Sequence, residues 1–234
     1  MLRLDKLKHI YNNTSQTPRQ ILDIPEWELE PGQQVLLRGV SGSGKTSLFN
    51  IIAGLMQPTA GRIWFEGTDL YKLGEAQRDH FRAQHIGYVF QNHYLLPTLT
   101  TLENVIMPMM FARALPAQVR KERATVMLQQ VGLQDHLDHR PARLSTGQRM
   151  RVAVARALVN QPALVLADEP TASLDSASAQ STMNLIQDVC QKANAILIVA
   201  SHDPALFARF PQIVDLKEGH LQRNNEITEE ITTP

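Results

Sequence analysis

The stretch from Gly39 to Thr46, GVSGSGKT, has the residue types and the spacing of a phosphate-binding loop. Its glycines let the backbone wrap closely around an anion, and free N–H groups at the start of the following helix attract it. The Lys45 ammonium could reach the terminal phosphates of a nucleotide, and the Thr46 hydroxyl could ligate Mg²⁺. The residues predicted to contact the nucleotide here are Gly39, Ser41, Gly42, Ser43, Gly44, Lys45, Thr46 and Ser47.

Two carboxylates, Asp168 and Glu169, follow the apolar run 163–167. Such a run is typical of a buried parallel strand, and ligands bind at the carboxyl ends of these strands. Asp168 is then placed to hold Mg²⁺ through water, whereas Glu169 points elsewhere and could polarise an attacking water as general base. Alone, the pair also fits a solvated turn before Pro170; the loop upstream favours the catalytic interpretation.

Strands that alternate with helices must position these groups. Apolar runs predict buried strands at 35–37, 86–90, 163–167 and 196–200, with helices at 47–53, 78–84 and 176–192. Further strands are expected at 2–10, 21–29 and 61–67, with a Pro31-Gly32 turn between two of the elements. This alternation predicts an α/β fold with a mainly parallel sheet.

The pattern of apolar residues changes between residues 92 and 160, where their spacing becomes that of a helix. Helices are expected at 102–110, with a kink at Pro108, at 116–131, with Pro116 in the first turn, and at 144–159. This block is interpreted as an all-helical insertion between two halves of the sheet. The polar residues 221–234 are predicted to form a frayed tail.

Composition narrows the class of protein. The chain has 234 residues, 43% of them apolar, and 23 basic residues balance 23 acidic ones, which argues against a nucleic-acid partner. A single cysteine, Cys190, permits no intramolecular disulfide and is expected to be a small buried apolar side chain in a reducing compartment. The longest apolar run, Ala195–Ala200, is far shorter than the ~20 residues that span a bilayer, so any membrane contact should come through a partner.

The segment 144–148, LSTGQ, and the basic, alanine-rich residues 149–158 resemble the signature motif of ATP-binding cassette (ABC) ATPases, written L-S-G-G-Q. Ser145, Gly147 and Gln148 match, and Thr146 stands where a second glycine is usual. In that family the motif faces the γ-phosphate bound by the other subunit, which implies that Ser145, Gly147 and Gln148 contact nucleotide. On its own, this segment could be a simple helix cap.

Other positions resemble the family's motifs in the family's order. Gln91 is similar to the glutamine that ligates Mg²⁺ and senses the transmembrane partner, and Ser173-Leu174-Asp175 to the loop that crosses the dimer interface. His202, in Ser201-His202-Asp203, resembles the switch histidine at the γ-phosphate, and Tyr11 the aromatic residue that stacks on adenine. Taken alone, each of these residues also has a purely structural explanation. Gln91 could be a polar residue at a strand end, and Asp175 a helix cap. His202 could be incidental, and Tyr11 could simply pack against its neighbours.

The resemblance implies a single ABC domain over 1–234. Its parts are a nucleotide-binding (RecA-like) core at about 1–91 and 161–220 with an N-terminal antiparallel β-subdomain, a helical signature subdomain at about 92–160, and the tail. It further implies ATP and Mg²⁺ as cofactors, with Glu169, His202 and Gln91 catalytic and with Thr46, Gln91 and Asp168 on the metal. Two copies would sandwich two ATP molecules and drive separate transmembrane permease subunits, at the cytoplasmic face of the inner membrane.

The run 86–105, IGYVFQNHYLLPTLTTLENV, is similar to the lipoprotein-release, macrolide-export and cell-division (LolD/MacB/FtsE-like) group. An amino-acid importer motor is the alternative, and a soluble non-transport ABC ATPase is a more distant one. Within this run, Tyr94, Leu95, Leu96 and Leu99 are predicted to line the groove that receives the membrane subunit, or else to belong to the core of the helical subdomain.

Overall fold

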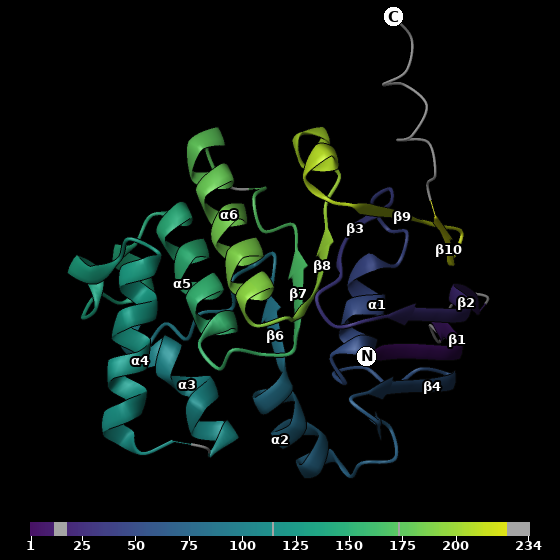
Figure 1. The fold of residues 1–234 in the computed structure, drawn as a ribbon, viewed down its shortest axis with the longest axis horizontal. Helices are drawn as coiled ribbons and strands as arrows, with labels where there is room; N and C mark the ends of the chain where they lie inside the picture. The colour runs from purple at the N-terminus through teal and green to yellow at the C-terminus, as the bar shows by residue number, and fades with distance from the viewer. Residues whose placement is uncertain (12–17, 114, 173, 224–234) are drawn as a thin grey trace, which may run out of the picture.

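A computed structural model describes residues 1–11, 18–113, 115–172 and 174–223, and Figure 1 shows their fold. The strands are β1 (Leu2–Tyr11), β2 (Arg19–Leu29), β3 (Gln34–Arg38), β4 (Ala60–Phe65), β5 (Thr68–Asp69), β6 (Ile86–Val89), β7 (Leu164–Asp168), β8 (Ile196–Ala200), β9 (Gln212–Lys217) and β10 (His220–Arg223). The α-helices are α1 (Lys45–Ile52), α2 (Glu75–His85), α3 (Thr101–Ala112), α4 (Ala117–Gln130), α5 (Thr146–Leu158) and α6 (Ser176–Lys192). Short 3₁₀ helices are η1 (Gln134–His136), η2 (Pro141–Arg143) and η3 (Pro204–Arg209).

The larger sheet has the strand order β10-β9-β3-β8-β7-β6. All neighbours from β9 to β6 are parallel, and β10 pairs antiparallel with β9 at the edge. The prediction of a mainly parallel sheet is therefore confirmed. Because β3, β8, β7 and β6 are adjacent and parallel, the segments that follow them all emerge at one edge of this sheet.

An antiparallel sheet, β2-β1-β4-β5, forms the N-terminal part of the fold, as predicted. Helix α1 packs between the two sheets: its Leu48, Phe49 and Ile52 are buried in one cluster with side chains from both. This arrangement explains why α1 is apolar on more than one side. It also fixes the start of α1, and with it the loop 39–46, against the centre of the parallel sheet (Figure 1).

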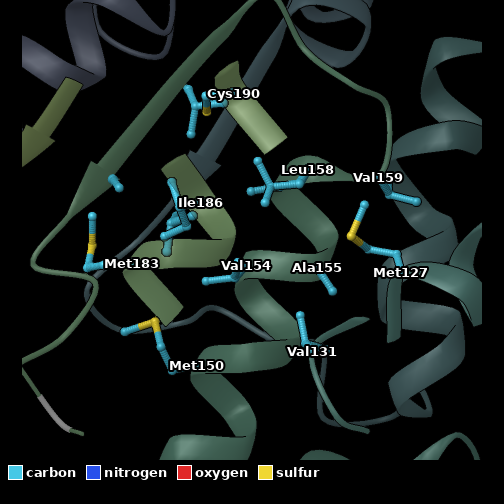
Figure 2. Close-up of a cluster of buried hydrophobic side chains, with 14 of the residues drawn as sticks. Met127, Val131, Met150, Val154, Ala155, Leu158, Val159, Met183, Ile186 and Cys190 are labelled. Atoms are coloured by element: carbon cyan, nitrogen blue, oxygen red, sulfur yellow. The ribbon is translucent and has the colours of Figure 1, made fainter. Parts of the chain in front are cut away.

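Helices α3, α4 and α5 lie between β6 and β7 in the chain, as the helical texture of 92–160 predicts, and they gather on one side of the molecule with α6 (Figure 1). Figure 2 shows their shared core, where Met150 and Val154 of α5 pack near Met183 and Ile186 of α6. Cys190 is buried in the same core, and burial raises the pKa of its thiol to about 12. The prediction of a small, buried, apolar cysteine side chain is confirmed.

Several predicted boundaries are wrong. Pro116 is the N-cap of α4 and not a first-turn residue, and α3 ends at Ala112, two residues later than predicted. Strand β9 has no counterpart among the predicted strands, and residues 221–223, predicted to begin a frayed tail, belong to β10. A turn at Glu218 and Gly219, both with positive φ, brings β10 back onto β9, and Leu221 packs against the core. Residues 224–234 lie outside the described part of the chain.

None of the helices in the described ranges is both long and apolar enough to cross a membrane.

Candidate active site

The loop 39–46 connects β3 to α1, and its shape depends on glycine. Gly42 and Gly44 have φ values of 76° and 104°, which side chains with a Cβ rarely adopt. A Cβ on Gly39 would lie 2.5 Å from Ser43 Oγ and 2.9 Å from the Leu216 carbonyl oxygen. The start of the loop is thus closely packed against β9, whereas Ser41 and Gly42 are exposed to solvent.

Two polar groups of this loop fit an incoming anion. The Lys45 ammonium donates hydrogen bonds to the carbonyls of Gly39 (2.6 Å) and Val40 (3.2 Å), so it already lies over the loop. The Ser43 hydroxyl is buried and has no hydrogen-bond partner in the described part of the chain. A buried, unpaired hydroxyl is costly, and a phosphate oxygen at this position would supply its missing acceptor.

Thr46 and Asp168, which are both predicted to hold Mg²⁺, lie on different elements and contact each other. Thr46, in the first turn of α1, donates its hydroxyl hydrogen to Asp168 Oδ2 at the end of β7, over 2.8 Å. Burial raises the pKa of Asp168, and the neighbouring Glu169 carboxylate acts in the same direction, whereas the Thr46 hydrogen bond and Lys45 oppose the shift. A poorly solvated carboxylate and a neighbouring hydroxyl together offer oxygen ligands that suit a divalent cation.

Glu169 and His202, both predicted to lie at the nucleotide site, are in contact with each other. Glu169 is only 8% exposed, and its Oε1 lies 2.8 Å from His202 Nδ1, while the Ser201 hydroxyl donates to Oε2 over 3.2 Å. The Glu169 backbone has a left-handed φ of 48°, fixed by a hydrogen bond from its N–H to the Ala200 carbonyl. The His202 side chain is 77% exposed, so it faces outward from the carboxylate that it contacts.

Ser201 was not among the predicted site residues. It is fully buried at the end of β8, and its N–H donates to the Leu37 carbonyl of β3. Its place next to His202 after a buried strand was the only sequence signal. The structure shows why it matters: with His202 it engages both oxygens of Glu169.

Gln91 and Tyr11 lie at the rims of the site. Gln91 is exposed two residues beyond Val89, which pairs with Ala167 of β7, so it stands at the edge where Asp168 lies. Tyr11 is 59% exposed at the end of β1 and pairs with Arg19 on β2. Nearby on β2, Ile21 approaches the loop so closely that a Cβ on Gly44 would be 2.9 Å from its Cγ2. The metal and adenine roles of these two residues stay predictions.

The signature segment forms the N-terminus of α5. Ser145 is the N-cap: its hydroxyl accepts from the Gln148 N–H (3.2 Å), and its own N–H donates to Gln148 Oε1 (2.8 Å). Gly147 is close to Leu174, whose Cδ2 a Cβ at 147 would meet at 3.2 Å. Asp175 caps α6 through the Ser178 N–H, whereas Ser173 lies outside the described residues.

The signature residues remain apart from the phosphate loop. Within the described ranges, no hydrogen bond connects Ser145, Gly147 or Gln148 with residues 39–46 or with the pair Asp168 and Glu169. One chain therefore holds two separate groups of predicted nucleotide contacts.

A phosphate loop after β3, at the centre of a parallel sheet, with a carboxylate pair at the end of β7, two strands away, defines a nucleotide-hydrolysing ATPase. Residues 22–172 match the family model described as ABC transporter, and the chain belongs to this family. It is the ATP-binding, ATP-hydrolysing motor subunit of an ABC transporter, as the motifs predict.

Relatives and solved structures agree with this assignment. The lipoprotein-releasing system ATP-binding protein LolD of Pseudomonas fluorescens is 45% identical over 194 residues, covering 83% of this chain and 85% of LolD. LolD of Legionella pneumophila (strain Paris) is 41% identical over 92% of this chain and 93% of its own. The dimeric post-hydrolysis structure of the ATP-binding cassette MJ0796, bound to ADP and Pi, superimposes with a TM-score of 0.90 at 32% identity, covering 96% of this chain and 98% of the other.

Proposed function

We propose that this chain is the ATP-binding subunit of a lipoprotein-releasing transporter, in which two copies close around two ATP–Mg²⁺ and drive separate membrane subunits. The observation that carries the ATPase chemistry is the pairing of Thr46 with Asp168 and of Glu169 with His202 and Ser201. The identity to LolD proteins supports lipoprotein release over amino-acid import.

Each residue at the sheet edge takes a distinct role in this proposal. Lys45 and the loop N–H groups bind the β- and γ-phosphates, and Thr46, Asp168 and Gln91 hold the Mg²⁺, which offsets negative charge on the phosphates. Glu169 accepts the proton of the attacking water. Its two oxygens are fixed by His202 and Ser201, so little reorganisation is needed when the water is activated.

The second copy completes each site. Because Ser145, Gly147 and Gln148 lie apart from the loop of their own chain, we infer that they contact the γ-phosphate bound by the partner copy. The N-terminus of α5 is exposed at Ser145 and Thr146, and its first-turn N–H groups suit contact with an anion. The dimeric form of the MJ0796 cassette supports this arrangement.

Contact with the membrane subunits is proposed at the loop after Gln91, on the cytoplasmic face of the inner membrane. Tyr94 and Leu96 are 63% and 44% exposed, and Met110 and Phe111 of α3 are exposed as well. Leu95 is partly buried and packs against the helical core, which favours the second of the two predicted alternatives for this residue. Apolar groups that face solvent on the surface of a soluble chain fit an apolar helix of a partner.

The proposal is tested by following lipoproteins in cells that lack this chain. Complementation with the wild-type chain should return lipoproteins from the inner to the outer membrane, whereas Glu169→Gln should leave them in the inner membrane. Membrane fractionation and immunoblotting measure the distribution. An unchanged distribution, together with a loss of amino-acid uptake, would favour the importer instead.

A further inference from the structure

We infer that His136 is a positioning residue for ATP hydrolysis: its imidazole holds the signature glutamine, Gln148, in the orientation that caps α5 at Ser145. The inference rests on the proposed role of the signature segment in the partner's site. His136 lies in η1, outside the signature segment, and carries none of the roles described above.

The orientation of the Gln148 amide follows from its contacts. Its Oε1 accepts the Ser145 backbone N–H at 2.8 Å, so its NH₂ group faces the other way. That NH₂ group lies 2.9 Å from His136 Nε2. Since an amide NH₂ can only donate, His136 Nε2 is the acceptor of this hydrogen bond.

The His136 segment is itself anchored, so the imidazole is a fixed acceptor. The N–H groups of Thr101 and Leu102, in the first turn of α3, donate to the carbonyls of His139 (2.7 Å) and Leu137 (3.0 Å). The His139 ring packs edge-on against the His136 ring, with centroids 5.0 Å apart. The three-member chain His136–Gln148–Ser145 therefore connects a braced turn to the hydroxyl predicted to meet the partner's nucleotide.

Without this acceptor the Gln148 amide would lose one of its two fixed contacts and could rotate away from Ser145. The Ser145 N–H and hydroxyl would then sample other orientations, and the partner's γ-phosphate would meet a less ordered site. ATP binding to the loop of the same chain would be untouched, because residues 39–46 do not contact His136.

The test compares His136→Leu, which removes the acceptor, with His136→Gln, whose amide oxygen replaces Nε2. Gln134→Leu is the matched control, since it introduces the same apolar side chain on the same 3₁₀ turn, at an exposed position whose amide contacts Asp135. ATPase rates at saturating ATP should fall roughly threefold to tenfold in His136→Leu, the effect of one lost hydrogen bond, and stay within about twofold of wild type in His136→Gln and Gln134→Leu. Melting temperatures and the binding of a fluorescent ATP analogue by the monomer should remain close to wild type.

A second measurement separates positioning from packing. In the Glu169→Gln background, the ATP concentration that gives half-maximal dimer by light scattering should rise for His136→Leu and return for His136→Gln. Equal rates for His136→Leu and wild type, or an equal loss in Gln134→Leu, would overturn the inference. If Glu169→Gln alone gives no ATP-dependent dimer, the proposed function fails instead, and the two failures are distinguishable.

Discussion

At the residue scale, Glu169 is the group on which hydrolysis depends. Glu169→Gln keeps the size of the side chain and can still accept from Ser201, but it cannot take a proton from water. We expect the ATPase rate to fall by about 10²-fold or more while ATP binding persists, because general-base catalysis is worth about that much. Steady-state phosphate release and size-exclusion chromatography with ATP measure the two effects, and the ATP-bound dimer should accumulate. Normal turnover would remove Glu169 from the role of base.

Thr146 is the residue at which this chain departs from the family's signature. Its hydroxyl accepts from Arg149 Nη2 at 2.9 Å, and Arg149 Nη1 also donates to the Leu144 carbonyl at 2.7 Å. The threonine oxygen is thus directed toward its own helix, where Arg149 holds it.

Thr146→Gly should therefore keep the ATPase rate within about twofold of wild type, because the hydroxyl is engaged within its own chain. It should lower the free energy of unfolding by less than about 1 kcal/mol, because glycine costs about that much relative to alanine in a helix and threonine is itself a poor helix former. Thr146→Val is the control, because it keeps the Cβ and removes only the acceptor. ATPase assays and urea titrations check both, and a large gain in rate for Thr146→Gly would show that Thr146 restrains catalysis.

At the element scale, α5 joins the signature at its N-terminus to the loop after Gln91 near its C-terminus. Arg156 donates to the carbonyls of His93 and Tyr94, which both have positive φ values, 59° and 45°. Burial lowers the pKa of Arg156 to about 10. Because this value is still well above neutral pH, the guanidinium stays charged.

Arg156→Met should leave those two carbonyls without donors and destabilise the left-handed turn. We expect the free energy of unfolding to fall by about 1.5–3 kcal/mol, the typical contribution of a hydrogen bond made by a charged group. Urea titration measures it, and Arg156→Lys should recover part of the loss because an ammonium can still donate to one carbonyl. A Met variant as stable as the wild type would contradict the role of Arg156 in holding this loop.

The neighbours Leu95 and Leu96 separate docking from packing within the same loop. Leu96→Glu places a charge on the exposed surface and should release the membrane subunits while ATP binding continues. Leu95→Glu should instead lower stability, because Leu95 packs on the helical core. Co-purification and thermal unfolding report the two outcomes. Val126→Glu, at an exposed position on α4, is the control for added charge. Retention of the partner by Leu96→Glu would place the docking surface elsewhere.

Elements with strong local signals could be predicted from the sequence. The bounds of α6 and β8 match the prediction residue for residue, because Asp175 marks a helix start and 196–200 is a continuous apolar run. By contrast, β10 carries one apolar residue, Leu221, and exists because β9 offers it a pairing edge. Likewise, the contacts of Leu95 depend on the fold around it, which periodicity does not describe.

The candidate site shows the same division. Motifs supplied its residue types and their order, but Thr46 and Asp168 are 122 positions apart and meet only because β3, β8 and β7 are neighbours. The roles of Ser201 and His136 were not predicted, because each depends on a contact with one distant side chain, Glu169 or Gln148. Single side-chain contacts of this kind leave no pattern in the sequence.

At the scale of the whole molecule, the separation of the signature from the phosphate loop predicts complementation between two inactive variants. Ser145→Arg should block hydrolysis in the partner's site while its own loop still binds ATP. Mixed with Glu169→Gln, it can form a heterodimer in which one site has both defects and the other has neither.

If the signature acts in the partner's site, the mixture should hydrolyse ATP although each variant alone does not. With random pairing, half of the dimers are mixed and each has one intact site, so the rate should reach about one quarter of wild type. If the signature acted within its own chain, one site would always lack Glu169 and the other Ser145, and the mixture would stay inactive. Phosphate release measured across mixing ratios decides between these outcomes, and a maximum near equal amounts is expected only for sites shared between two copies.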